Sequence, residues 1–214
     1  SRIPSGRSLA SAPATLLHFP PGPQHPPGHG IEFGDERRIA RLGGRHHRTI
    51  EGVVRRPSAS SREGALLSLD AEAIVAKADT TFLASASAEI LRDGIHGCDV
   101  SHRGGKPGFW KRQTVNGRTR LTMPDFSGNF FFMTLGNLAE NPRVGVAFVD
   151  FDTGDLLSLT GTAEVTWEGR ELEAFEGAER LVHVDVDDGA LVRGLVPFAW
   201  SAPDYAKQLA DTGA

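Results

Sequence analysis

Cysteine is nearly absent from this sequence, because Cys98 is the only one among 214 residues. A single cysteine excludes an internal disulfide framework and a cysteine-rich metal cluster. Long apolar runs are missing too, since none approaches the ~18 residues of a membrane-spanning helix. No charged, apolar and small-residue signal pattern opens the chain. We therefore expect a protein of the reducing cytoplasm, with no membrane partner.

An excess of positive charge is also missing. The 23 Lys and Arg residues are outnumbered by 27 Asp and Glu residues, which gives a net charge of -4 and a pI near 6.1. Such a chain has no general attraction for nucleic acid or an anionic membrane, so any basic site must be local. Apolar residues make up 39% of the sequence, enough to build the core of one ordinary domain.

The first part of the chain has no apolar pattern to bury. Residues 1–30 contain seven of the 13 prolines and four glycines, so we predict an extended arm. His18, His25 and His29 offer metal ligands there, but proline-rich spacing does not preorganise them, and solvated loop histidines are favoured. Residues 35–62 are rich in arginine, which suggests either a phosphate or RNA contact or a solvated surface. The surface is favoured because no aromatic residues interleave with the arginines: Arg37, Arg38, Arg41, Arg45, Arg48, Arg55, Arg56 and Arg62.

We divide the chain into an arm, 1–62, and a folded domain, 63–214. The domain opens with "SLDAEAIVAKA", which predicts a helix over 68–78 with Asp70 as its cap and an apolar stripe of Ala73, Ile74 and Ala78. Seven strand-like runs follow at short spacing: 80–88, 108–115, 119–124, 143–151, 156–167, 179–188 and 195–200.

Turns and one inserted helix complete the predicted fold. "VNGR" at 115–118 predicts a type I′ hairpin turn, and "DTGD" at 152–155 predicts a second turn. Between the third and fourth runs, Ser127 or Asn129 can cap a helix that ends at Asn141-Pro142. Many short strands with one inserted helix favour a mainly β fold, an antiparallel barrel rather than a parallel Rossmann sheet.

Two segments carry chemistry. "CDVSHRGGKPGFW" at 98–110 places Ser101, His102, Arg103 and Lys106 among glycines and a proline, so it is expected to bend around an anion. "MPDFSGNFFFMTLGN" at 123–137 enters a helix after Gly128, and a helix start exposes backbone N–H groups that attract phosphate. From composition alone, a structural glycine turn is the more common explanation.

Residues 79–200 resemble the pyridoxamine 5'-phosphate oxidase-like, FMN-binding split-barrel family. The resemblance is carried by "DVSHRGGKPGF", by "MPDFSGNFFFMTLGNLAENPRVGVAFVDFDTGDLLSLTGTAEV", and by "FEGAERL" and "LVPFAW". It is closest to the branch often fused to flavin reductase and ferredoxin modules. The resemblance implies a split β-barrel, a C2 homodimer with FMN between two barrels, and a small-molecule substrate or electron partner. The dimer is also expected because apolar strands such as 143–151 would otherwise lie exposed.

The resemblance also implies the cofactor-binding residues. The FMN phosphate would be held from the first segment by Ser101, Arg103 and Lys106, and from the second by Ser127, Gly128, Asn129, Thr134 and Asn137. The backbone of Met123, Pro124 and Asp125 would run beside the flavin ring and tune it. No catalytic residue is identified. His102 could deliver a proton or contact the phosphate, or could have no role. Trp200 suits either covering of the flavin or packing, and packing is favoured for Phe130, Phe131 and Phe132.

The sequence departs from true pyridoxamine phosphate oxidases. The strand before the hairpin reads "GFWKRQ", the second phosphate signature is replaced by "GNFFFMTLGN", Leu156 or Leu157 stands near the usual glutamine, and the end reads "FAWSAPDYAKQL". Oxidation of vitamin B6 is therefore not expected. Two function classes stay open: an FMN-dependent oxidoreductase, which we favour, and a flavin carrier, sensor or electron-transfer module without turnover. A barrel that binds haem or a deazaflavin is a third possibility.

Overall fold

The computed structural model describes residues 46–48, 50–54, 59–90, 97–126 and 133–205. The chain divides into residues 1–36, none of which is described, and residues 37–214. The predictions for the proline-rich arm, for its three histidines and for most of the arginines therefore lie outside the described residues. In the described part, no helix is long and apolar enough to cross a membrane.

Helix α1 spans Leu69–Lys77 and begins two residues earlier than a cap at Asp70 requires. The Ser68 side chain caps it by accepting a hydrogen bond from the Ala71 N–H at 3.3 Å, so the prediction of Asp70 as the cap was wrong. Glu63 fixes this cap, because its carboxylate accepts from both the N–H and the hydroxyl of Ser68 at 2.8 and 2.9 Å. The apolar stripe is shifted as well: Ala73 is exposed, whereas Ala71, Ile74, Val75 and Ala78 are buried.

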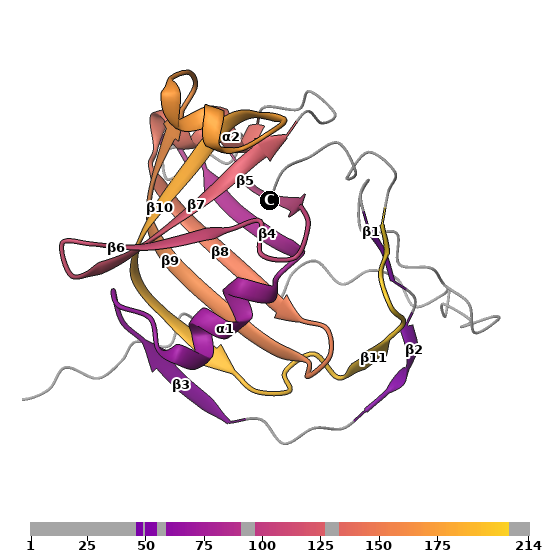
Figure 1. Ribbon diagram of the computed structural model, residues 1–214. Helices are drawn as coiled ribbons and strands as arrows, with labels where there is room; N and C mark the ends of the chain where they lie inside the picture. The colour runs from indigo at the N-terminus through magenta and orange to yellow at the C-terminus, as the bar shows by residue number, and fades with distance from the viewer. Residues whose placement is uncertain (1–45, 49, 55–58, 91–96, 127–132, 206–214) are drawn as a thin grey trace, which may run out of the picture. The chain divides into compact units, whose positions relative to one another are not determined.

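One antiparallel sheet dominates the described residues (Figure 1). This confirms the predicted mainly β, antiparallel class. Its strand order is β5 (Cys98–Gly104), β4 (Thr80–Ala86), β8 (Arg143–Asp150), β9 (Asp155–Thr166), β10 (Ala178–Val192), β7 (Arg118–Phe126) and β6 (Lys111–Val115), with β3 (Ser60–Glu63) paired to the end of β10. No described strand joins β5 to β6, so the sheet is not closed.

Both predicted turns join neighbouring strands. Asn116 and Gly117 have φ of 51° and 75°, the positive values that a type I′ turn requires, and they connect β6 to β7. Gly154, with φ of 72°, lies in the turn between β8 and β9, where Asp150 pairs with Asp155. Local turn chemistry therefore sets the register of two hairpins.

The core lies on one face of this sheet, because apolar residues alternate along the strands. Val144, Val146 and Phe148 of β8 are 4%, 2% and 0% exposed. Leu157 and Leu159 of β9 are 0% and 1% exposed. These side chains are buried within a single chain, so the exposed apolar surface that we expected from these strands is not there. The homodimer loses that argument and stays a prediction from the resemblance.

The sheet curls so that β5, at one edge, comes close to β7, which lies next to the other edge. Arg103 lies on edge strand β5 and Asp125 on β7, with β4, β8, β9 and β10 between them in the sheet order, yet their side chains form an ion pair at 3.5 Å. Helix α2 (Met133–Glu140) packs beside this junction against β4, β5 and β9, and it ends before Asn141-Pro142 as predicted. The arrangement agrees with a split barrel.

Two short strand pairs lie outside the main sheet (Figure 1). β1 (His46–His47) pairs with β12 (Asp204–Tyr205), and β2 (Ile50–Val53) pairs with β11 (Phe198–Trp200). A 3-10 helix, η1 (Arg170–Ala174), connects β9 to β10. The segment around Arg48 is thus paired with the end of the described chain rather than extended on its own.

Candidate functional site

The segment at 98–110 forms strand β5 over its first half, which corrects the expectation of a loop bent around an anion. Its glycines serve packing instead. A Cβ on Gly105 would lie 2.4 Å from Cγ of Phe109, a side chain that is 1% exposed. Gly108 adopts φ of 78°, where a Cβ would meet the Ala76 carbonyl oxygen at 2.8 Å. The strand, rather than the glycines, is what presents polar side chains to a ligand.

An arginine pair lies where β5 comes close to β7. Asp125 contacts Arg103 at 3.5 Å and Arg180 at 3.6 Å, and the three side chains are 12%, 22% and 10% exposed. Both distances exceed the 2.7–3.2 Å range that is typical of N–H···O hydrogen bonds. The Nε atom of Arg103 is buried and has no hydrogen-bond partner among the described residues. A buried donor without an acceptor is what an anion site needs.

Hydroxyl groups continue the same surface on β5 and α2. The Ser101 hydroxyl donates to Asp99 Oδ2 at 2.7 Å, and the Thr134 hydroxyl donates to the same oxygen at 2.6 Å. The two hydroxyl oxygens are 2.5 Å apart. Ser101 is two residues from Arg103, so both side chains lie on one face of β5. The structure thus brings together Ser101, Arg103, Thr134 and Asp125 of the predicted site.

The remaining predicted residues are placed differently. Met123 is fully buried in the core, and its backbone pairs with Val182 of β10. Lys106 follows β5 and is half-buried, and the Asn137 amide donates to Ser85 Oγ at 3.1 Å. Ser127, Gly128, Asn129 and the three phenylalanines, Phe130, Phe131 and Phe132, lie outside the described residues.

Strand β7 has a side without a strand partner near the arginine pair, among the described strands. β6 pairs with β7 only as far as Thr122, while β10 pairs with it up to Phe126. Among the described strands, none therefore lies on the β6 side of Met123, Pro124 and Asp125. This is where the resemblance puts the flavin ring.

Two other candidates are placed away from these groups. His102 lies on β5 with the opposite side-chain direction to Ser101 and Arg103, and its ring meets Phe82 edge-on at 5.9 Å. Trp200 packs edge-on against Phe151 and Phe198 at 5.3 and 5.8 Å. For Trp200 the packing role is the one that the contacts support.

Arg180 is the site residue that sequence reasoning missed. The sequence contained a sign of this role. Val182, Val184 and Val186 are core residues at 0% exposure, and Arg180 lies two residues before them in the same alternation, so it faces the core as well. Glu179 beside it has no partner residue in β7, because the β10–β7 register shifts between Ala178 and Arg180, and its carboxylate pairs with the Arg180 guanidinium. Such bulges re-aim side chains and are common next to functional sites.

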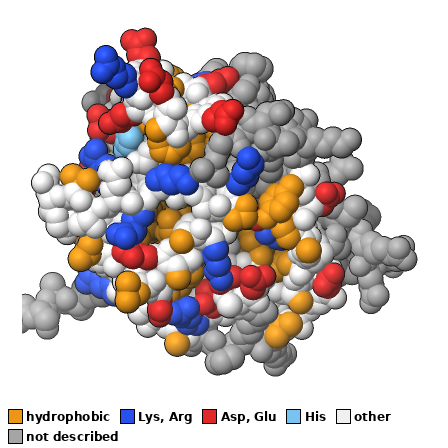
Figure 2. Space-filling model, in the orientation of Figure 1, with side chains coloured by type: hydrophobic (Ala, Val, Ile, Leu, Met, Phe, Trp, Pro, Cys, Tyr) orange, Lys and Arg blue, Asp and Glu red, His pale blue; other side chains and the backbone are white. Residues whose placement is uncertain are grey.

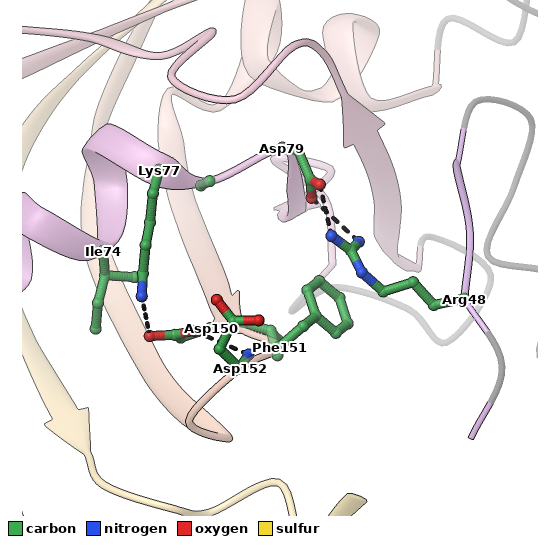
Figure 3. A pocket seen from close by; sticks show the side chains of 9 residues that line it. Arg48, Ile74, Lys77, Asp79, Asp150, Phe151 and Asp152 are labelled. Carbon is green, nitrogen blue, oxygen red and sulfur yellow. Dashed lines mark hydrogen bonds and ion pairs between the residues drawn. The ribbon is translucent and has the colours of Figure 1, made fainter. Parts of the chain in front are cut away.

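A separate pocket lies between the end of α1, the end of β8 and Arg48 (Figure 3). Arg48 pairs with both oxygens of Asp79 at 3.2 and 2.6 Å, and its guanidinium lies 4.1 Å from the Phe151 ring centroid. Lys77 pairs with Asp150 at 2.5 Å. Burial raises the pKa of Asp150, but hydrogen bonds from Lys77 and Thr153 outweigh it and hold that pKa below its ordinary value. These paired charges indicate a structural closure rather than a ligand site, and Arg48 is not the solvated arginine that we expected.

The opposite face of β10 carries a buried histidine. His183 is 8% exposed, and the hydroxyls of Thr122 and Thr166 lie 3.0 and 3.1 Å from its two ring nitrogens. Burial lowers the pKa of His183, and the charge of Glu171 opposes that shift.

On the face shown in Figure 2, acidic and basic side chains are interspersed rather than gathered into one basic area.

Solved structures with some likeness to this chain exist, although no known family profile and no curated protein matches it. HupZ from Group A Streptococcus is 13% identical over 64% of this chain and 100% of its own, with a TM-score of 0.43. A putative pyridoxamine 5'-phosphate oxidase from Lactobacillus delbrueckii is 15% identical over 58% and 93%, with a TM-score of 0.42. A Clostridium acetobutylicum protein related to general stress protein 26 of B. subtilis, of the pyridoxinephosphate oxidase family, is 13% identical over 66% and 88%, with a TM-score of 0.32. The names of the last two agree with the family that residues 79–200 resemble, but likeness at this level carries no argument about function.

Proposed function

We propose that this protein binds FMN, with the phosphate held where β5, β7 and α2 meet. The observation that carries the proposal is the buried Nε of Arg103, a cationic donor without a hydrogen-bond acceptor among the described residues. The hydroxyls of Ser101 and Thr134 lie 2.5 Å apart, and Ser101 shares a face of β5 with Arg103. A phosphate offers the acceptor oxygens that this donor set lacks, and a guanidinium binds them through directed, charge-assisted hydrogen bonds. The donor chemistry therefore fits the group.

The two aspartates beside these donors are compatible with a phosphate site. Asp99 accepts from both hydroxyls, and Asp125 lies near both guanidinium groups. These carboxylates keep the donors on one surface in the absence of a ligand. A bound phosphate would compete with these carboxylates for the same hydrogen-bond donors, and this competition limits the affinity for FMN.

The proposed activity is that of an FMN-dependent oxidoreductase acting on a small molecule or an electron partner. Bound flavin supplies hydride and electron transfer, and the protein supplies binding, orientation and polarity. On the side of β7 where no described strand pairs with residues 123–126, the backbone groups are the ones proposed to contact the planar ring. Vitamin B6 oxidation is not proposed, because the sequence lacks the family's substrate residues. A flavin-binding module without turnover is the second candidate, since no catalytic residue is identified.

Flavin titrations test the proposal. The purified protein should absorb as a flavoprotein, or should quench FMN fluorescence with micromolar or better affinity. Riboflavin should bind far more weakly, since it lacks the phosphate. Equal affinities would remove the phosphate site, and a haem or deazaflavin spectrum would replace FMN as the cofactor. Reduction of the FMN-loaded protein by NADH or NADPH under air then separates an oxidoreductase from a module without turnover.

The homodimer is proposed together with the cofactor, because the resemblance implies flavin sites shared by two barrels. Sedimentation should show a C2-sized dimer at micromolar concentration. A stable monomer that still binds FMN would contradict the dimer while leaving the cofactor in place.

A further inference from the structure

Arg180 lies beside the predicted phosphate site, although no sequence argument assigned it a role. It extends from β10 on the core face of the sheet, directly across from Asp125 in the register of β10 and β7. Arg103 approaches the same carboxylate from β5 on the other side. Asp125 therefore lies between two guanidinium groups, one from β5 and one from β10, and the Arg180 guanidinium also pairs with Glu179.

The contacts in this cluster are long for buried charges. The ion pairs of Asp125 measure 3.5 and 3.6 Å, although all three side chains are mostly withdrawn from solvent. Removing charges from water is costly, and the attraction offsets that cost only when the geometry is good and the donors are satisfied. The buried Nε of Arg103 is not satisfied. The cluster is thus poorly explained as a device for stability alone.

We propose that Arg180 is the second arginine of the anion site, and that Asp125 is an internal anion which the phosphate of FMN displaces from the two arginines. This inference rests on the proposed function, since it takes the FMN phosphate as the ligand. A phosphate dianion carries more charge and more acceptor oxygens than one carboxylate, so it can engage both guanidinium groups with short hydrogen bonds. Arg180 then sets affinity directly, and Asp125 lowers affinity by competing.

The same two strands provide a matched control. Arg120 of β7 and Asp185 of β10 are also paired in register, on the other face of the sheet, with two hydrogen bonds of 2.7 Å. Replacing Arg120 removes one arginine from the same strand pair but leaves Arg103, Asp125 and Arg180 unchanged. Any effect that Arg120→Ala and Arg180→Ala share is due to a general change in the sheet and not to a loss of phosphate contacts.

The experiment titrates FMN and riboflavin into the full-length wild type and into Arg180→Ala, Arg180→Lys, Asp125→Asn and Arg120→Ala. We expect Arg180→Ala to weaken FMN binding at least 10-fold and Arg180→Lys to recover part of the loss. Asp125→Asn should tighten FMN binding about 3- to 10-fold, because the amide keeps the shape of the side chain and removes its charge. Riboflavin affinity and the Arg120→Ala titration should stay at wild-type values.

The outcomes separate this inference from the function on which it rests. A wild type that does not prefer FMN over riboflavin contradicts the proposed function. If the wild type prefers FMN but Arg180→Ala and Arg120→Ala have equal FMN affinity, the proposed role of Arg180 is overturned and the proposed function is not. Weaker FMN binding by Asp125→Asn would show that Asp125 positions the arginines rather than competes. If Arg180→Ala does not fold, Arg180→Lys decides, and unchanged FMN affinity in that variant, whose ammonium lacks the guanidinium fork, overturns the role of Arg180.

Discussion

Two arginine–aspartate pairs join the same two strands and differ in every other respect. Arg120 and Asp185 meet through two hydrogen bonds of 2.7 Å on the outer face, with side chains 30% and 36% exposed. Arg180 and Asp125 face the core, are 10% and 12% exposed, and approach only to 3.6 Å. The partly exposed pair thus has short hydrogen bonds, whereas the buried pair has only a long ion-pair contact.

The difference shows which pair is complete. The hydrogen bond from Arg120 holds the pKa of Asp185 below its ordinary value and raises the pKa of Arg120, as expected for a saturated pair. Such a pair needs nothing more and serves the sheet. In the buried pair, Asp125 is shared between two guanidinium groups at 3.5 and 3.6 Å, and Arg180 also pairs with Glu179, so the Nε of Arg103 is the donor that a further anion would satisfy. We infer that the first pair is structural and the second functional.

The largest expected effect comes from removing the unsatisfied donor itself. Arg103→Ala should weaken FMN binding by about 2 to 3 kcal/mol, roughly 30- to 150-fold, the scale for losing a charge-assisted hydrogen bond to a buried anion. Lys106→Ala should cost less, and Arg103→Lys should restore only part of the loss. Fluorescence titration with FMN and riboflavin measures all three. Unchanged FMN affinity in a folded Arg103→Ala variant would make Arg103 an ordinary ion-pairing residue.

A smaller effect is expected at the hydroxyl groups. Thr134→Val keeps the shape of a fully buried side chain but removes the hydroxyl that contacts Ser101 and Asp99. FMN affinity should fall by about 3- to 10-fold, since one neutral hydrogen bond contributes on the order of 1 kcal/mol. Thr134→Ser is the control and should bind FMN nearly as well as the wild type. Equal binding by the Val and Ser variants would remove Thr134 from the site.

The outer pair should affect stability and not binding. Arg120→Ala is expected to lower the free energy of unfolding by about 0.5 to 1 kcal/mol, discounted for solvent screening of a partly exposed pair. Because the pKa of Asp185 is lowered in the folded state, its contribution is present above the unfolded value of 3.8 and is lost as pH falls through the folded pKa. Urea unfolding should therefore separate the variant from the wild type at pH 7 and bring them together in strong acid. A change in FMN affinity would break the distinction between the two pairs.

His183 lies between the two pairs in the β7–β10 register, paired with Thr122, and should give the smallest effect. Burial lowers its pKa below 6.5, so the unfolded chain takes up the proton first, and stability should fall as pH drops from above 6.5 through the folded pKa. Glu171, Glu164 and Asp185 favour the proton and Arg120 opposes it. His183→Gln keeps a donor and an acceptor for the two threonines and should flatten the melting temperature between pH 7.5 and 5.5. An equal slope in both proteins would show that His183 does not titrate with folding.

Local sequence patterns predicted most of the fold, because alternation, hairpin turns and the proline after α2 act over few residues. The Asn116-Gly117 turn and the end of α2 at Glu140 are where they were predicted. The cap of α1 was misplaced because Ser68 and Asp70 are both good caps, and the choice was made by the carboxylate of Glu63, five residues before Ser68. Strand β5 was taken for a loop because glycines follow it, and the reason for Gly105, its close packing on Phe109, is one that no local pattern shows.

The site was only half predictable for a related reason. Ser101 and Arg103 share a face of β5 by simple alternation, and a motif pointed to both. Their neighbours Asp125 and Arg180 arrive only when the sheet curls and brings β5 to β7, an event that depends on the whole core. Arg48 was misjudged in the same way, because its partner Asp79 is distant in sequence.

A crystal structure of the protein with bound FMN would test the central claim most directly. The account predicts phosphate oxygens within hydrogen-bond distance of Arg103 Nε and of the Arg180 guanidinium, with the Asp125 carboxylate turned away from both. A phosphate bound elsewhere, with the contacts of Asp125 at 3.5 and 3.6 Å unchanged, would contradict it.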